Sequence, residues 1–141
     1  MDQKVLILCT GNSCRSIIAE ALINAELKGI SAESSGVKAS GHVNPNAKKV
    51  LEQVGIWKDA YHSKTLDTMI DNDYDLVVTV CDNAKETCPM FPKAVKTIHV
   101  GFEDPDGKEF EAFEEILVEI REVLLPQIKA VLSGDNTLQN A

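Results

Sequence analysis

The chain has 141 residues, of which 44% are hydrophobic, and its formal net charge at pH 7 is −8. This length and apolar content predict one domain over residues 1–141, with a real hydrophobic core and a polar tail over about 133–141. The acidic balance argues against nucleic acid as a partner, because most of the surface would repel a polyanion. No apolar run is long enough for a membrane span or a secretory leader, so we expect a cytoplasmic protein without membrane contact.

The first candidate element is a short apolar strand over residues 4–8, followed directly by a loop and a helix start. The loop reads Cys9-Thr10-Gly11-Asn12-Ser13-Cys14-Arg15-Ser16. Backbone N–H groups, a helix N-terminus and a guanidinium can together bind a tetrahedral oxyanion. The same positive field would lower the pKa of the Cys9 thiol to roughly 3.5–7.5. Cys9 is therefore the candidate nucleophile and Arg15 the candidate oxyanion ligand.

The elements that follow alternate between strand and helix along the chain. Candidate strands are 30–35, 76–80 and 95–100, and candidate helices are 17–29, 44–55, 65–70 and 110–128, the last kinked or restarted at Pro126. The apolar run before Cys9 lacks period-two alternation, as expected for a central parallel strand covered on both faces. We therefore expect an α/β fold with three layers, in which a four-stranded parallel open sheet carries helices on both faces.

Four cysteines remain to be explained in a reducing compartment, where structural disulfides are rare. Cys9 and Cys14 are five residues apart, and Cys81 and Cys88 are seven apart, whereas zinc sites usually pair cysteines two to four residues apart. Redox chemistry is the favoured interpretation, with packing favoured for Cys14. Cys9 and Cys81 both follow strands and should share one sheet edge. Joining Cys81 to Cys88 would require the segment between them to unwind or loop, since a regular helix separates them by about 10 Å.

A tight acidic loop, residues 101–107, follows the last candidate strand and should lie at the same edge of the sheet. Asp104 in this loop is a candidate acid for protonating a leaving oxygen. Its position before Pro105 is also typical of an ordinary turn residue.

Three motifs together resemble the thioredoxin-coupled arsenate reductases, which are built on the low-molecular-weight tyrosine phosphatase fold. They are the loop from Cys9 to Ser16, the pair Cys81 and Cys88 followed by Pro89, and the run from His99 to Pro105. The likeness extends from about residue 4 to residue 131. It implies reduction of arsenate to arsenite in arsenic detoxification, with no bound cofactor and with thioredoxin as electron donor and partner. We expect a monomer.

The resemblance also implies roles for individual residues. Arsenate would bind to the loop residues Thr10, Gly11, Asn12, Ser13, Cys14, Arg15 and Ser16. Cys9 would attack arsenic while Asp104 protonates a departing hydroxyl, and Ser16 would hydrogen-bond the thiolate. Cys81 would then attack Cys9, and Cys88 would attack Cys81 to leave a disulfide that thioredoxin reduces by thiol–disulfide exchange.

One feature departs from that family. In some members a potassium ion is held by groups that match Asn12, Glu20 and Ser34, together with an acidic residue whose place is taken here by Lys64. We expect no metal, with the Lys64 ammonium standing where the cation would.

Two other functions remain open from the residues alone. Phosphomonoester hydrolysis would use Cys9, Arg15 and Asp104 and would not need Cys81 or Cys88. A non-enzymatic oxyanion or redox sensor is the other, although sensing would not require Asp104. Phosphatases of this fold usually carry aromatic residues just after the Asp-Pro pair, whereas Asp106, Gly107 and Lys108 follow here, which favours a small inorganic substrate.

Overall fold

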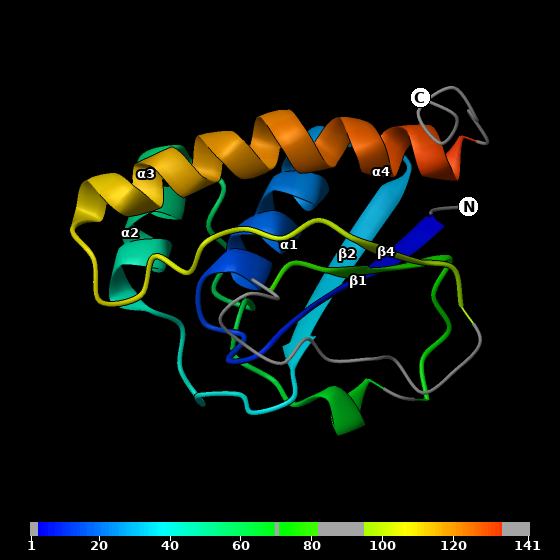
Figure 1. Ribbon diagram of the computed structural model, residues 1–141, viewed down its shortest axis with the longest axis horizontal. Coiled ribbons are helices and arrows are strands. Elements are labelled where there is room, and N and C mark those ends of the chain that lie inside the picture. Colours follow the sequence, from blue (N-terminus) through cyan, green and yellow to red (C-terminus); the bar gives the residue numbers. More distant parts are fainter. Residues whose placement is uncertain (1–2, 70, 82–94, 134–141) are drawn as a thin grey trace.

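The computed structural model describes residues 3–69, 71–81 and 95–133. Within these ranges the strands β1 (Gln3–Cys9), β2 (Ile30–Gly36), β3 (Leu76–Thr79) and β4 (Thr97–His99) form one sheet in the order β2-β1-β3-β4. Every pairing is parallel, and Leu8 of β1 lies opposite Ser35 on one side and Thr79 on the other. The predicted four-stranded parallel sheet is confirmed (Figure 1).

The helices follow the predicted order with differences at their ends. They are α1 (Arg15–Glu26), α2 (Pro45–Gln53), the 3-10 turn η1 (Leu66–Thr68), α3 (Phe110–Glu119), the π-helical segment η2 (Ile120–Leu124) and α4 (Leu125–Leu132). Figure 1 shows α3, η2 and α4 as one long rod along the molecule. Pro126 restarts this rod rather than ending it. Proline has no backbone N–H to donate to the preceding turn, and the wide π turn η2 lies just before it.

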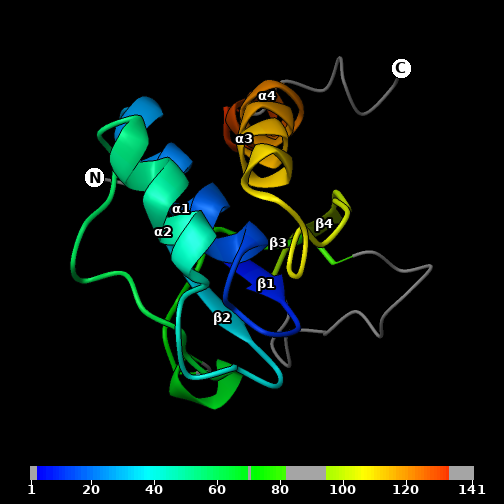
Figure 2. The same cartoon turned by 90° about the vertical axis from the view of Figure 1, so that its left-hand side faces the viewer.

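The two faces of the sheet are covered differently. Val5 and Ile7 of β1 point into a large core formed with α1, α2 and the C-terminal rod. Leu6 and Leu8 point to the other face, where they pack in a smaller cluster with Met69, Tyr74 and Val77. Figure 2 shows the α-helices on one side of the sheet and η1 on the other. Helical segments on both faces are thus confirmed, although in the described ranges the second face carries a 3-10 turn.

The C-terminal edge of the sheet gathers the predicted functional segments. Cys9 ends β1 and the helix α1 begins at Arg15, while Gly36 ends β2 beside them. Cys81 lies two residues beyond β3, and the segment after β4 leads into the acid loop, residues 101–107. This edge is where ligands bind in open parallel sheets. No helix in the described part of the chain is long and apolar enough to cross a membrane.

Candidate active site

The loop between β1 and α1, residues 9–16, is called the anion loop here, and it turns its carbonyl groups outward. The carbonyl oxygens of Thr10, Gly11 and Ser13 accept N–H groups from the segment 37–44, at 2.9, 2.9 and 3.0 Å. In a planar trans peptide the N–H points opposite to the C=O. The amides that follow these three carbonyls therefore face the inside of the loop, as an oxyanion site requires.

A cavity of about 250 Å³ lies inside this loop. The predicted loop residues from Cys9 to Arg15 all line it, whereas Ser16 lies behind the nucleophile and contacts it from the helix side. The remaining lining comes from the acid loop and from the segment after β2, namely Asp104, Asp106 and Ser40. The cavity is therefore a junction of three loops at the C-terminal edge of the sheet.

Cys9 sits at the base of the cavity with its side chain almost entirely buried. Its Sγ atom lies 2.9 Å from Ser16 Oγ and accepts the Asn12 N–H over 3.1 Å. Burial raises the pKa of the Cys9 thiol, while the Ser16 hydrogen bond, the Arg15 charge and the Asn12 N–H act to lower it. The expectation of a lowered pKa is therefore wrong for this structure, because it counted the stabilising groups and left out the lost hydration of the thiolate.

Asn12 holds the anion loop in its turn. Its φ angle of 48° lies in the left-handed region, where asparagine is one of the few residues found routinely. The fully buried side chain donates to Ser16 Oγ at 2.8 Å and to Ser34 Oγ at 2.9 Å, and accepts the Lys64 N–H at 2.6 Å. Asn12 thus connects Ser16, which contacts Cys9, to strand β2 and to the backbone of Lys64.

Gly36 allows this close approach of β2 to the anion loop. A Cβ atom at this position would lie 2.5 Å from the carbonyl oxygen of Thr10 and 3.0 Å from the Asn12 nitrogen. Both neighbours are backbone atoms, so a side chain at residue 36 would displace the loop itself.

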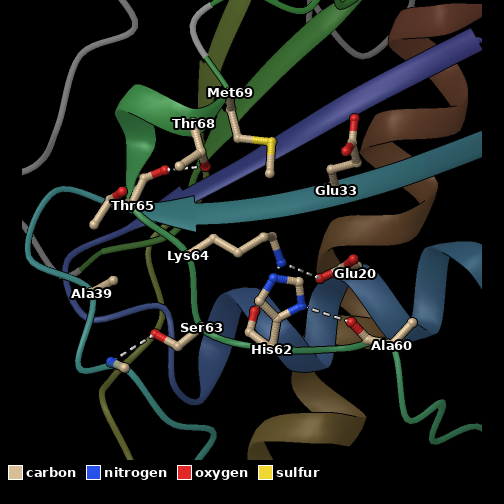
Figure 3. Close-up of a pocket in the computed structure, with 11 residues that line it drawn as sticks. Glu20, Glu33, Ala39, Ala60, His62, Ser63, Lys64, Thr65, Thr68 and Met69 are labelled. Atoms are coloured by element: carbon tan, nitrogen blue, oxygen red, sulfur yellow. Dashed lines mark hydrogen bonds and ion pairs between the residues drawn. The ribbon is translucent and has the colours of Figure 1, made fainter.

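The predicted cation region is assembled around Glu20. Ser34 Oγ donates to Glu20 Oε1 over 2.6 Å, and Lys64 Nζ lies 3.9 Å from the same oxygen while donating to the carbonyl of His62. Figure 3 shows Lys64 extending toward Glu20. Both residues line a surface hollow of about 610 Å³. Burial raises the pKa of the Glu20 carboxyl, and Lys64 and Ser34 oppose that rise. Among the residues described, no group of three metal-ligating side chains comes together.

Arg15 brings the acid loop against the anion loop. It is 3% exposed; its Nη1 donates to the Phe102 carbonyl over 3.0 Å, and its Nη2 lies 3.7 Å from Asp104 Oδ2. The side chain of Asp104 is half exposed. The structure therefore places Asp104 and Arg15, 89 residues apart in sequence, at one cavity.

The other cysteines occupy different positions. Cys81 is disulfide-bonded and fully buried two residues beyond β3, the strand next to β1, and it is not among the described residues that line the cavity. Cys88 lies outside the described residues. Cys14 is buried with its Sγ 3.7 Å from Ser13 Oγ, and burial raises its pKa to about 12, so it is a neutral thiol at pH 7.

Some residues at the cavity were not identified from the sequence. Ser40 and Asp106 line it, and Asn44 connects the anion loop to Asp106. The sequence predicts Asn44 only as the start of the helix 44–55, and Asn44 does cap that helix, since its Oδ1 accepts the Asn46 N–H at 2.8 Å. Its other contacts join segments far apart in sequence, and no local pattern signals them.

Comparison with known proteins places this site in a family. The family model of low-molecular-weight phosphotyrosine protein phosphatases matches residues 4–136. An arsenate reductase of Bacillus cereus is 44% identical over 84% of this chain and 88% of its own.

Solved structures with both names share the fold. An arsenate reductase from Archaeoglobus fulgidus superimposes with a TM-score of 0.76 at 36% identity, over 84% of this chain and 93% of the other. A low-molecular-weight protein tyrosine phosphatase from T. tengcongensis gives 0.75 at 25% identity, over 91% and 99%. Because the two TM-scores are nearly equal, backbone shape does not separate the two activities.

Proposed function

The chain belongs to the low-molecular-weight phosphotyrosine protein phosphatase family, and we propose that within this family it is an arsenate reductase that serves arsenic detoxification. The cavity of Cys9, Arg15 and Asp104 suits either an arsenate or a phosphate group. The observation that carries the proposal is Cys81, a further, disulfide-bonded cysteine just after the strand beside β1, where a phosphatase has no use for a redox-active sulfur. The identity with the Bacillus cereus arsenate reductase supports the same choice.

In the proposed mechanism the anion loop first binds arsenate. The inward amides and the Arg15 guanidinium hold its oxygens. The amides need no rearrangement, because segment 37–44 already binds the loop carbonyl groups that precede them. The Cys9 thiolate attacks arsenic and forms an S–As bond. One As–O bond breaks, and Asp104 protonates the departing hydroxyl, which leaves as water.

The redox step follows on sulfur. In the reduced enzyme the Cys81 thiolate attacks Cys9 Sγ, so that an S–S bond forms and the S–As bond breaks. The electron pair of the S–As bond stays on arsenic, which is reduced from As(V) to As(III) and leaves as arsenite. The two cysteines together lose the two electrons that arsenic gains, and become a disulfide.

Regeneration requires a further thiol and an external dithiol. Cys88 attacks Cys81, which frees Cys9 and leaves a Cys81–Cys88 disulfide. The dithiol of thioredoxin then reduces this disulfide by exchange and is itself oxidised. Because Cys81 is fully buried, its sulfur has to become exposed before a second protein can reach it. No metal or organic cofactor takes part in these steps.

We extend the proposal to the cation region, where Lys64 takes the place of a monovalent cation. The support is the 3.9 Å approach of its ammonium to Glu20, at the end of the hydrogen-bonded series from Glu20 through Ser34 to Asn12. A fixed positive charge at this point keeps a second cation away, so activity should be nearly indifferent to potassium.

Hydrolysis of phosphomonoesters is the second candidate function. The family description and the shared cavity favour it, because Cys9, Arg15 and Asp104 would suffice through a phosphocysteine. The residues directly after the Asp104-Pro105 pair include no aromatic side chain that could pack against phosphotyrosine. We therefore propose hydrolysis only as a weak side activity.

The test compares the wild type with Cys88→Ser in arsenate, thioredoxin, thioredoxin reductase and NADPH. Steady arsenite production is expected for the wild type, and at most one arsenite per molecule for the variant, because the oxidised Cys9–Cys81 pair cannot be resolved. The first turnover is the internal control: it should be as fast in Cys88→Ser as in the wild type, which shows that the variant is folded.

Two results would overturn these assignments separately. Continued turnover by Cys88→Ser with thioredoxin would remove Cys88 from the relay. Robust phosphatase turnover with no arsenate-dependent use of NADPH would mean that the chain is a phosphomonoester hydrolase and not an arsenate reductase.

A further inference from the structure

The acid loop is attached to the wall of the cavity by a side-chain hydrogen bond that the proposed mechanism does not use. Asn44 Nδ2 donates to Asp106 Oδ1 over 2.7 Å, across 62 positions of sequence. Asp106 lines the cavity together with Asp104. Asp106 is exposed and Asn44 is only partly buried, so the contact is not explained as the satisfaction of buried polar groups.

Asn44 is a rigid point of attachment. Its N–H donates to the carbonyl of Ser13 in the anion loop over 3.0 Å. Its Oδ1 caps α2 by accepting the Asn46 N–H. Because both of these bonds fix Asn44, its remaining amide N–H group offers the acid loop a partner that is fixed relative to the cavity.

Asp106 acts directly on the proposed acid. Its backbone N–H donates to Asp104 Oδ1 over 3.0 Å, which leaves Asp104 Oδ2 on the side of Arg15 Nη2, 3.7 Å away. The side chain of Asp104 is half exposed. The location of residue 106 therefore determines how the Asp104 carboxyl is turned toward the cavity.

We infer that Asp106 is a positioning residue for Asp104, held in place by Asn44. The Asn44–Asp106 hydrogen bond fixes the far end of the acid loop, as the Arg15 contact with the Phe102 carbonyl fixes the near end. Losing it should slow the step in which the hydroxyl leaves without weakening the binding of the oxyanion. This inference rests on the proposed function for its chemistry, and on the contacts above for its geometry.

The hydrogen bond can be separated from the charge of Asp106 by two substitutions. Asp106→Ala and Asp106→Asn both remove a negative charge from the cavity, but only the asparagine retains an oxygen that accepts from Asn44. On the other side, Asn44→Ser keeps the backbone N–H and remains a good helix cap, while it loses the Nδ2 donor.

The experiment measures arsenite formed in a single turnover, with enzyme in excess over arsenate. Asp106→Ala and Asn44→Ser should be about three- to tenfold slower than wild type, a part of the roughly 100-fold or more that a general acid supplies. Asp106→Asn should stay within about twofold of wild type, and Asn44→Ser with Asp106→Ala should be no slower than either alone, since both remove the same contact. Phosphate dissociation constants, measured by calorimetry, should be equal for Asp106→Ala and Asp106→Asn.

Equal rates for Asp106→Ala and Asp106→Asn would overturn the inference, and so would weaker phosphate binding by the alanine variant alone. A wild type that forms no arsenite would instead defeat the proposed function. The same variants would then be compared in hydrolysis of phenyl phosphate, where Asp104 protonates phenoxide. The same order of rates is expected there, and equal rates would overturn the inference.

Discussion

The anion loop and the acid loop face the same cavity but are built in opposite ways. Arg15 and Cys9 in the first are almost entirely buried, whereas Asp104 in the second is half exposed. The anion loop is held by Asn12, by the segment 37–44 and by the close approach of β2. The acid loop is held at its two ends by Arg15 and Asn44. Groups that bind charge need prior order, whereas a group that delivers one proton needs only the right orientation.

The largest effect is expected from Arg15→Lys in the buried anion loop. Lysine cannot make two parallel hydrogen bonds to an oxyanion and cannot also reach the Phe102 carbonyl in the same geometry. We expect arsenate kcat/KM to fall about 100- to 1,000-fold, with weaker phosphate binding by calorimetry. The matched control is Arg121→Lys, whose ion pair with Glu26 lies at the surface and which should be unchanged. Undiminished phosphate binding by Arg15→Lys would contradict its assignment as the oxyanion ligand.

Asp104→Asn should separate the role of the acid loop from that of the anion loop most clearly. We expect the single-turnover rate to fall about 100-fold, because the leaving hydroxyl loses its proton donor. Phosphate binding should be no weaker than in wild type, since a negative charge has been removed. Glu103→Gln makes the same change of charge one residue away and is the control, because Glu103 pairs with Lys108. If both variants lost the same activity, the effect would belong to charge in the acid loop and not to Asp104.

Ser16→Ala tests how the buried anion loop determines the pKa of the Cys9 thiol. Burial has already raised the pKa of Cys9, and losing the Ser16 hydrogen bond should raise it further. The thiolate forms as pH rises, so the rising limb of the rate profile should move to the alkaline side. The rate deficit should be present on that limb and should vanish above both pKa values.

Alkylation of Cys9 by iodoacetamide, followed across pH by mass spectrometry of the Cys9 peptide, measures the same titration without turnover. A Ser16→Ala enzyme that is slower at every pH, with its rising limb unmoved, would mean that Ser16 acts otherwise than on the thiolate.

The smallest effect concerns the Lys64 side of the anion loop. Potassium at a concentration matched by sodium in the control should change neither the rate nor the melting temperature appreciably, because Lys64 already faces Glu20. A marked rise in either quantity with potassium alone would show that the ammonium does not replace a cation.

Much of this site was predictable because each of its parts is a short, continuous segment of the chain. The strand, the anion loop and the start of α1 are one continuous segment, so Cys9 and Arg15 could be identified from spacing and local polarity. Asp104 followed from a rule of parallel sheets, namely that the loops after successive strands meet at one edge. The 3-10 turn at η1 and the π turn before Pro126 were less accessible, because packing as well as local preference decides them.

What the sequence by itself determined is the chemistry: a thiol, a guanidinium and a carboxyl at one edge of a parallel sheet. Only the tertiary structure decided how these groups behave. Burial of Cys9 raised a pKa that the neighbouring charges alone would have lowered. The contacts from Asn44 to Ser13 and Asp106 joined three loops whose partners are far apart in the chain. Spacing in sequence encodes which groups follow a strand, but hydration and distant hydrogen bonds exist only once the chain has folded.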